Sequence, residues 1–233
     1  QKIPVIVLNG FLGSGKTTLF RSLLSQSKRK KMSVCAIVND MSELDIDGEL
    51  ISSTGAVEDD QRILESISSF VLSSKAGIEK LDQSIIKLLN NNRPDIIIVE
   101  TSGSCHPMPL IKYFKKHERI KLTGVFVLVD SLMLANDFDY GKKLIPNMQQ
   151  NIIDGVRDPI NLLVEQILFC SHLILTKGDK IESYQLQNIA DSIREINPYQ
   201  QVSVLKQRGK IFVDIRNMWK GHYTKKGIRL TLE

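Results

Sequence analysis

Short apolar runs rich in β-branched residues recur along the chain and alternate with stretches of helical periodicity. Each run is apolar at nearly every position, which is typical of strands buried on both faces of a parallel sheet. The runs predicted to be strands are residues 5–8, 34–38, 96–99, 125–129, 173–175 and 202–205. Helical spacing predicts helices over residues 17–26 and 78–90. This alternation predicts an α/β fold, a mostly parallel sheet flanked by helices.

A glycine-rich segment joins the first predicted strand to the first predicted helix. Residues 10–17 read GFLGSGKT and fit the pattern G-x-x-x-x-G-K-[ST] at every position. Glycines let the backbone curl so that successive N–H groups face a phosphate, and the helix start adds positive charge. We expect Lys16 to reach the β- and γ-phosphates and the Thr17 hydroxyl to bind Mg²⁺. The residues predicted to contact the nucleotide here are Gly13, Ser14, Gly15, Lys16, Thr17 and Thr18. The fold is therefore predicted to be a three-layer P-loop NTPase domain.

A carboxylate closes the apolar run at residues 96–99. Glu100 ends this strand, and Gly103 follows three residues later. An acid at the end of a strand beside a P-loop can hold Mg²⁺ or the water around it. Gly103 can donate its backbone N–H to a γ-phosphate and move when that phosphate leaves. We predict that Glu100 binds Mg²⁺ and that Gly103 contacts the nucleotide.

Residues 176–179 read TKGD at the end of a later apolar run. This segment resembles the [NT]-K-x-D element with which GTPases recognise guanine. The carboxylate of Asp179 would accept hydrogen bonds from the ring N1–H and the exocyclic amine, a donor pair that adenine lacks. The stem of Lys177 would pack along the base. Thr176, Lys177 and Asp179 are therefore predicted to bind guanine and to exclude ATP.

Composition limits the classes of partner and compartment. The chain is 42% hydrophobic and 24% charged, which excludes an intrinsically disordered protein. No apolar run reaches the roughly 18 residues of a membrane span, so no membrane partner is predicted. The net charge is +5 and its densest run, residues 28–31, suits the C-terminus of a helix, so nucleic-acid binding is not predicted. Three widely spaced cysteines, Cys35, Cys105 and Cys170, indicate free thiols in a reducing compartment, which predicts a cytoplasmic protein.

Five segments, taken in order, resemble the CobW-type metal-handling P-loop GTPases, whose relatives are HypB and UreG. The segments are GFLGSGKTT at 10–18, VND at 38–40, ETSG at 100–103, VD at 129–130 and EQILFCSHLILTKGD at 165–179. The resemblance spans residues 3–205. It implies GTP or GDP bound with Mg²⁺, slow GTP hydrolysis, and delivery or insertion of a transition metal such as Zn, Co or Ni.

The same resemblance assigns roles to further residues and partners. It implies that Asp40 is a switch acid near Mg²⁺, and that Lys206 contacts the base. Lys16, Asp40 and Glu100 are the residues predicted to act in catalysis, and the spacing does not decide which acid orients the attacking water. A client metalloprotein and a nucleotide-dependent homodimer are the implied partners.

One family feature is missing. CobW-type proteins usually carry a C-x-C-C metal motif between the switch acid and the ETSG strand, but residues 66–75 read SISSFVLSSK. Serine hydroxyls do not replace thiolates as ligands for soft metals, so the usual metal site is predicted to be absent. Cys105 and His106 follow ETSG after one intervening serine, and we predict a packed thiol and a surface imidazole there. Pro107 and Pro109 predict a rigid turn.

These observations predict a slow GTPase that acts as a conformational switch in metal-cofactor handling or client maturation. Closure of residues 39–60 and 101–108 on the γ-phosphate would be the switch. Two alternatives stay open: a GTP-dependent interaction switch that carries no metal, and a P-loop small-molecule kinase. The TKGD segment and the lack of an arginine-rich lid argue against the kinase. We predict a GTPase domain over residues 1–207, followed at 208–233 by an extension or the start of a further domain.

Overall fold

One parallel sheet forms the centre of the protein. The computed structural model describes residues 1–11, 13–39, 62–68, 70–197 and 202–204. Within these residues the strand order is β3-β2-β4-β1-β5-β6-β7, and every neighbouring pair is parallel. The strands are β1 (Ile3–Gly10), β2 (Val34–Asn39), β3 (Arg62–Ile67), β4 (Ile96–Glu100), β5 (Ile120–Asp130), β6 (His172–Thr176) and β7 (Val202–Val204). The predicted α/β class with a parallel sheet is confirmed.

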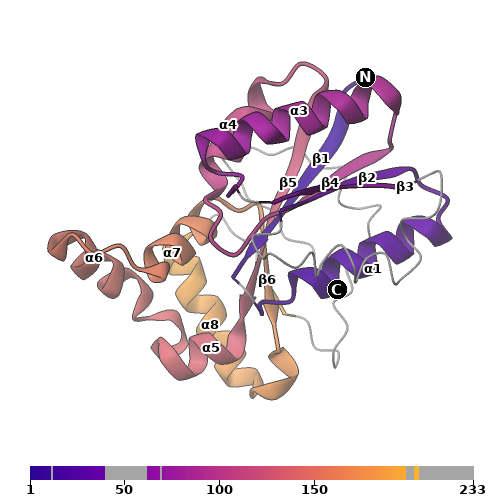
Figure 1. Cartoon of the computed structure of the whole chain (residues 1–233). Helices are drawn as coiled ribbons and strands as arrows, with labels where there is room; N and C mark the ends of the chain where they lie inside the picture. The colour runs from indigo at the N-terminus through magenta and orange to yellow at the C-terminus, as the bar shows by residue number, and fades with distance from the viewer. Residues whose placement is uncertain (12, 40–61, 69, 198–201, 205–233) are drawn as a thin grey trace.

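Helices cover both faces of the sheet. The described helices are α1 (Lys16–Arg29), α3 (Lys75–Asn91), α4 (Pro107–Lys116), α5 (Ser131–Asp137), α6 (Leu144–Asp154), α7 (Pro159–Phe169) and α8 (Ser183–Ile196). Figure 1 shows α3 and α4 on one side of the sheet and α1 on the other. The connection through α1 runs from β1 to β2, toward the β3 end of the sheet. The connections through α3, α4, α7 and α8 run in the opposite direction, toward the β7 end. Right-handed crossovers therefore place α1 on one face and the other helices on the opposite face.

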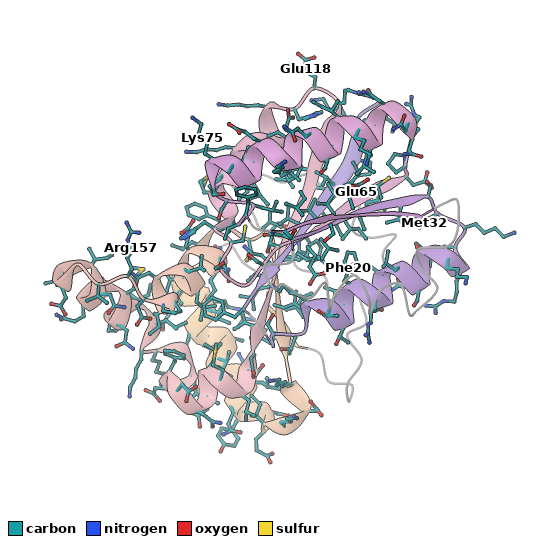
Figure 2. All side chains as sticks on the ribbon, in the orientation of Figure 1. Phe20, Met32, Glu65, Lys75, Glu118 and Arg157 are labelled. Carbon is teal, nitrogen blue, oxygen red and sulfur yellow. The ribbon has the colours of Figure 1, made fainter. Side chains whose placement is uncertain are left out.

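The alternation of side chains along β1 supplies both halves of the core. Ile6 and Leu8 pack with Leu19, Phe20 and Leu23 of α1. Figure 2 shows Phe20 between α1 and the sheet, where none of its surface is exposed. Val5 and Val7 point to the other face and pack with the buried faces of α3 and α4. Burying each large apolar side chain stabilises the fold by about 1.5–3 kcal/mol, so both helical layers are held mainly by apolar packing.

Six described elements differ from the sequence prediction, namely β3, α4 and the helices α5, α6, α7 and α8, none of which the sequence analysis predicted. β3 was not predicted, because its segment mixes charged and apolar residues; in the described residues it lies at one end of the strand order, where two-sided burial is not required. The rigid turn predicted at Pro107 and Pro109 is wrong, since these residues begin α4. Proline fits the first helical turn, where the missing N–H has no partner in any case. The segment 101–108 is thus a loop only as far as His106.

All seven described strands end at one edge of the sheet because all of them are parallel. Gly10, Asn39, Glu100, Asp130 and Thr176 are the last residues of five of them. In α/β sheets, ligands bind in the crevice beyond these carboxyl ends. This carboxyl edge therefore collects the candidate site residues. Among the described residues, no helix combines the length and the apolarity that a membrane span requires.

Candidate nucleotide-binding site

The loop between β1 and α1 has a backbone that requires glycine. Gly10, Gly13 and Gly15 have φ angles of +142°, +78° and +106°. A Cβ on Gly10 would lie 2.6 Å from the carbonyl oxygen of Leu128 on β5. Any residue with a side chain would therefore clash with β5 at this position. Gly15 caps α1 in the left-handed conformation, and the Ser14 N–H donates to the carbonyl of Phe11 at 3.1 Å. The glycines thus curl the chain directly into the positive end of α1.

Lys16 contacts the segment that follows Glu100 at the end of β4. Its Nζ donates a hydrogen bond to the Thr101 carbonyl at 2.9 Å, and the side chain is buried, with 8% of its surface exposed. Glu100, the preceding residue, is 3% exposed. Gly103 is half-buried in the turn that follows. The structure therefore brings together two predicted groups that lie 85 residues apart in the chain.

The TKGD segment joins the same site through Thr176. Its Oγ1 donates to the Ser14 carbonyl at 2.8 Å, which fixes the end of β6 to the phosphate loop. Lys177 adopts the left-handed conformation with φ +59°, and Asp179 is exposed in the short helical turn η2 (Gly178–Lys180) that follows. The predicted base-binding residues are thus placed beside the predicted phosphate-binding residues.

Asp130 holds Lys177 in place. The Lys177 Nζ lies 2.6 Å from Oδ2 of Asp130. The other carboxylate oxygen, Oδ1, accepts the backbone N–H groups of Leu132 and Met133 at 2.9 and 3.1 Å, which caps α5. The sequence resemblance included Asp130 without giving it a role.

Two buried amides that the sequence analysis did not consider join the site. Oδ1 of Asn9 accepts the N–H of Gly10 at 3.0 Å, the hydroxyl of Thr101 at 3.0 Å and Nε2 of Gln166 at 3.1 Å. The same Gln166 nitrogen lies 3.3 Å from the Cys105 carbonyl. Both residues are 1% exposed. Asn9 is the one polar side chain in the apolar run of β1, which was the available signal for it because buried polar groups need partners. Gln166 follows a charged residue in α7, so no such signal marked its position in the sequence.

The segment that carries cysteines in the family has a different role in this chain. Leu72 is fully buried in the core, and its N–H donates to Oδ1 of Asn39 at 3.2 Å. Ser74 caps α3 by accepting the N–H of Gly77 at 3.0 Å. Oγ of Ser73 accepts the N–H of His106 at 3.1 Å. These contacts stabilise the loop and leave no thiolate at this position.

The residues after Gly103 match the predicted packed thiol and surface imidazole. Cys105 is fully buried, and burial raises the pKa of its thiol to about 11, so the thiol stays neutral at neutral pH. His106 is exposed, and its Nδ1 lies 2.6 Å from Oε2 of Glu165 on α7. Cys35 and Cys170 are also buried, and neither is in a disulfide bond, as predicted. Across the described ranges, no three His, Cys, Asp or Glu side chains are grouped to hold a metal.

Several predicted site residues lie outside the described residues. These are Asp40 and Lys206, together with nearly all of the predicted switch loop 39–60. Thr17 is half-buried and Thr18 exposed in the first turn of α1. Of the predicted nucleotide-binding residues that the structure describes, all lie at the carboxyl edge or in the first turn of the helix that starts there.

Residues 4–204 match the protein family described as the CobW/HypB/UreG nucleotide-binding domain. The chain belongs to this family. The resemblance read from the five segments is thus confirmed, and CobW/HypB/UreG membership supports the GTPase interpretation over the kinase and over the metal-free switch.

Curated relatives of this CobW/HypB/UreG domain are longer than the chain. A zinc-regulated GTPase metalloprotein activator 1 of Dictyostelium discoideum is 31% identical over 214 residues, which cover 85% of this chain and 44% of that protein. A zinc chaperone CobW of a Sinorhizobium species is 30% identical over 220 residues, which cover 90% of this chain and 60% of that protein. The chain therefore spans about half the length of these relatives.

Solved structures support the fold. HypB from Helicobacter pylori in complex with nickel superposes with a TM-score of 0.55 at 13% identity, covering 87% of this chain and 78% of that chain. Chloroplast FtsY from Physcomitrella patens gives 0.52 at 16% identity, covering 92% and 63%. Likeness at this identity concerns the fold alone, and it agrees with a P-loop α/β domain.

Proposed function

We propose that this domain binds GTP with Mg²⁺ at the carboxyl edge, hydrolyses it slowly and serves as the conformational switch of a metal-handling protein. One observation carries the proposal: Ser14 and Lys16 of the phosphate loop are bonded to Thr176 and Thr101 of the base-binding and strand-end acid segments. These two contacts support assigning the three segments to one nucleotide site. Family membership supports the same function.

The phosphate end of the site is built from backbone donors and one lysine. Residues 13–17 would surround the β- and γ-phosphates with N–H groups, and Lys16 would add its charge next to them. Apart from its chain neighbours, no described residue has an atom within 4 Å of a Cβ placed on Gly13, so among the described residues the outer side of the loop has room for a ligand. Catalysis in this class consists of positioning and charge stabilisation, so these groups would do most of the work.

Thr17 and Glu100 fit a magnesium ion that accompanies the nucleotide. The first is a hydroxyl in the first turn of α1, and the second is a carboxylate at the end of the neighbouring strand β4. Hydroxyl and carboxylate oxygens are ligands that Mg²⁺ prefers, and the ion supplies charge that offsets the phosphate oxygens. We assign Thr17 and Glu100 to this ion, with Asp40 as a further acid of the same site.

Titration calorimetry with GTP, GDP and ATP in the presence of Mg²⁺ tests the guanine assignment. Asp179→Ala removes the acceptor for two guanine donors, and we expect GTP affinity to fall at least about tenfold, with ATP binding unchanged. Asp191→Ala, at an exposed position on α8, is the matched control and should bind GTP as the native protein does. Equal affinity of the native protein for ATP and GTP would contradict the assignment.

Zinc is the metal that the relatives' names mention, and we propose that the full protein handles zinc as cargo. The usual thiolate motif is missing, so the ligands would have to come from outside the described residues. Equilibrium dialysis against Zn²⁺ with GTP or GDP should give about one zinc per chain. No bound zinc with either nucleotide would instead favour a switch that acts on a client metalloprotein, or through a homodimer, without carrying metal.

A further inference from the structure

A row of cations lies at the amino edge of the sheet, opposite the nucleotide site. β2, β4, β1 and β5 are consecutive neighbours in the sheet. Lys31 and Arg93 each lie three residues before one of these strands, Lys2 lies directly before β1, and Lys121 is the second residue of β5. Neighbouring parallel strands are about 4.8 Å apart, so the four strand starts form a continuous row. We call residues 2, 28–31, 93, 119 and 121 the basic edge.

The centre of the basic edge is hollow. A cavity of about 640 Å³ is lined by Lys2, Arg93 and Lys121, with Ile3, Pro4 and Pro94 between them. A second cavity of about 380 Å³ adjoins it through the shared Lys2 and Arg93 and is lined by Arg119 as well. In Figure 2 this edge lies along the upper right of the molecule, between the labelled Glu118 and Met32. The two cavities form one groove along the strand starts.

The positive charge of the groove is not neutralised by the acids beside it. Asp95 and Glu118 are the acids that line it. Oδ2 of Asp95 accepts the N–H of Ser33 at 2.8 Å. In the part of the chain that the structure describes, no ion pair involves Lys2, Arg93 or Lys121. Several cations thus face the groove without a carboxylate bound to them.

Two of the cations are held in place by the backbone. Nη2 of Arg119 donates to the carbonyl of Leu89 at 2.9 Å, and Nζ of Lys2 donates to the carbonyl of His117 at 3.3 Å. Burial is the main cause that lowers the pKa of His117; the charges of Asp82 and Glu118 raise it, and those of Arg119 and Lys2 lower it. Part of the groove is therefore fixed before any ligand binds.

We propose that the basic edge binds an acidic polypeptide segment of a partner protein. Carboxylates of such a segment would meet Lys2, Arg93 and Lys121, and its apolar stems would pack on Ile3, Pro4 and Pro94. Stacking of single-stranded bases needs aromatic side chains, and membrane insertion needs exposed apolar ones. None of the large exposed apolar side chains in the described ranges belongs to this edge. The positive charge of the groove and the apolar residues that line it together fit an acidic peptide best.

Such a partner would leave the nucleotide site open. β1 has eight residues, so the two edges are separated by about 26 Å along this strand. The proposal is also independent of the GTPase assignment, because none of the nucleotide-binding residues lies at the amino edge. Binding of the peptide and of GTP can therefore be measured separately on the same variants.

Fluorescence anisotropy with a short labelled peptide of alternating Glu and Val tests the proposal. The native protein should bind it in a salt-dependent manner, and the same peptide with Gln in place of Glu should not bind. Arg93→Glu with Lys121→Glu should weaken binding at least about tenfold, which corresponds to about 1.4 kcal/mol. Lys80→Glu with Lys142→Glu reverses the same amount of charge at exposed positions outside this edge and should leave binding within about twofold.

Four outcomes would overturn the proposal. These are no binding of the Glu-Val peptide, equal loss in both double variants, tighter binding of a uridine oligonucleotide of equal charge, and tighter binding to phosphatidylserine vesicles. The last two would make the edge a nucleic-acid or membrane contact instead. Thermal unfolding and GTP titration of both double variants establish that each is folded. Should Arg93→Glu with Lys121→Glu fail to fold, Arg93→Gln with Lys121→Gln removes the two positive charges without adding negative ones, and its expected loss of affinity decides the question.

Discussion

Asp130 divides its two carboxylate oxygens between a helix and a lysine. One oxygen caps α5, and the other holds the Lys177 ammonium at 2.6 Å. The backbone of Lys177 is in the left-handed region, which few residues other than glycine adopt. This conformation sets the direction in which its side chain leaves the backbone. The position of the side chain assigned to the guanine face therefore depends on a residue outside the TKGD segment.

Asp130→Asn separates these two roles. The amide oxygen can still accept the N–H groups that cap α5, whereas the charge that holds Lys177 is lost. We expect GTP affinity to fall by about three- to tenfold with little loss of stability, because the ion pair is partly exposed and its net contribution is modest. Calorimetric titration and a urea melt measure the two quantities.

Asp130→Ala is the companion variant, since it removes the cap as well. Its unfolding free energy should be lower than that of Asp130→Asn by about 1 kcal/mol, the usual contribution of a helix N-cap. Unchanged GTP affinity in both variants would show that Lys177 needs no such support.

At the scale of elements, α7 is hydrogen-bonded directly to segments of the candidate site. Gln166 bonds Asn9 at the end of β1 and the Cys105 carbonyl, and the neighbouring Glu165 pairs with His106. Two consecutive residues of one helix thus hold both β1 and the loop that follows Glu100. Movement of that loop upon nucleotide binding or hydrolysis would be passed to α7.

Gln166→Leu tests how far this connection supports the fold. Leucine has a similar size but donates no hydrogen bond, so the buried Cys105 carbonyl and Asn9 amide oxygen each lose a donor. We expect a loss of about 1–3 kcal/mol in the free energy of unfolding, measured in urea. Gln150→Leu on α6 is an exposed control and should change stability by less than about 0.5 kcal/mol. A cost no larger than that of the control would contradict the role of Gln166.

The elements differ in how far the sequence could predict them. β1, β2, β4, β5 and β6 were predictable because each is an apolar run buried on both faces. β3 carries Arg62 and Glu65 and was not, since a strand at the end of the row needs no such run. α4 was missed because its first-turn prolines also fit a turn.

The candidate site combines residues that are adjacent in the sequence with contacts between segments that are far apart in it. The phosphate loop is encoded in eight consecutive residues, so its position and backbone followed from the pattern. The contacts of Asn9, Gln166 and Asp130 join strands and helices far apart in the chain. Sequence spacing alone does not say which distant groups these three side chains contact. The roles of Asn9, Gln166 and Asp130 could therefore be assigned only from the structure.

At the scale of the whole molecule, His172 links stability to pH. It is the first residue of β6, its ring stacks on Phe126 with centroids 4.3 Å apart, and Nδ1 lies 2.7 Å from Oγ of Ser171. Burial lowers the pKa of His172 to about 4. The ring is therefore neutral in the folded protein at pH values where the unfolded chain, with a pKa of about 6.5, binds a proton.

The sign of the effect follows from that difference. The unfolded state takes up the proton first, so the stability that is present above about pH 6.5 is lost as pH falls toward about 4. Urea unfolding at pH 7 and pH 5 should show a smaller loss in His172→Phe, which keeps the stack on Phe126. Gln150→Leu, at an exposed position on α6, should lose as much as the native protein. Equal losses in all three proteins would refute the role of His172.

The hydrogen bond from Thr176 to Ser14 has a consequence for how this domain can evolve. This bond joins the segment proposed to select the base to the loop proposed to bind the phosphates, because Thr176 donates to the Ser14 carbonyl. A substitution that displaces the end of β6 to admit another base would also pull on the phosphate loop, and affinity for every nucleotide would fall together. Preference for guanine is therefore expected to change only through side chains beyond Thr176, such as Asp179, and not by remodelling the strand end itself.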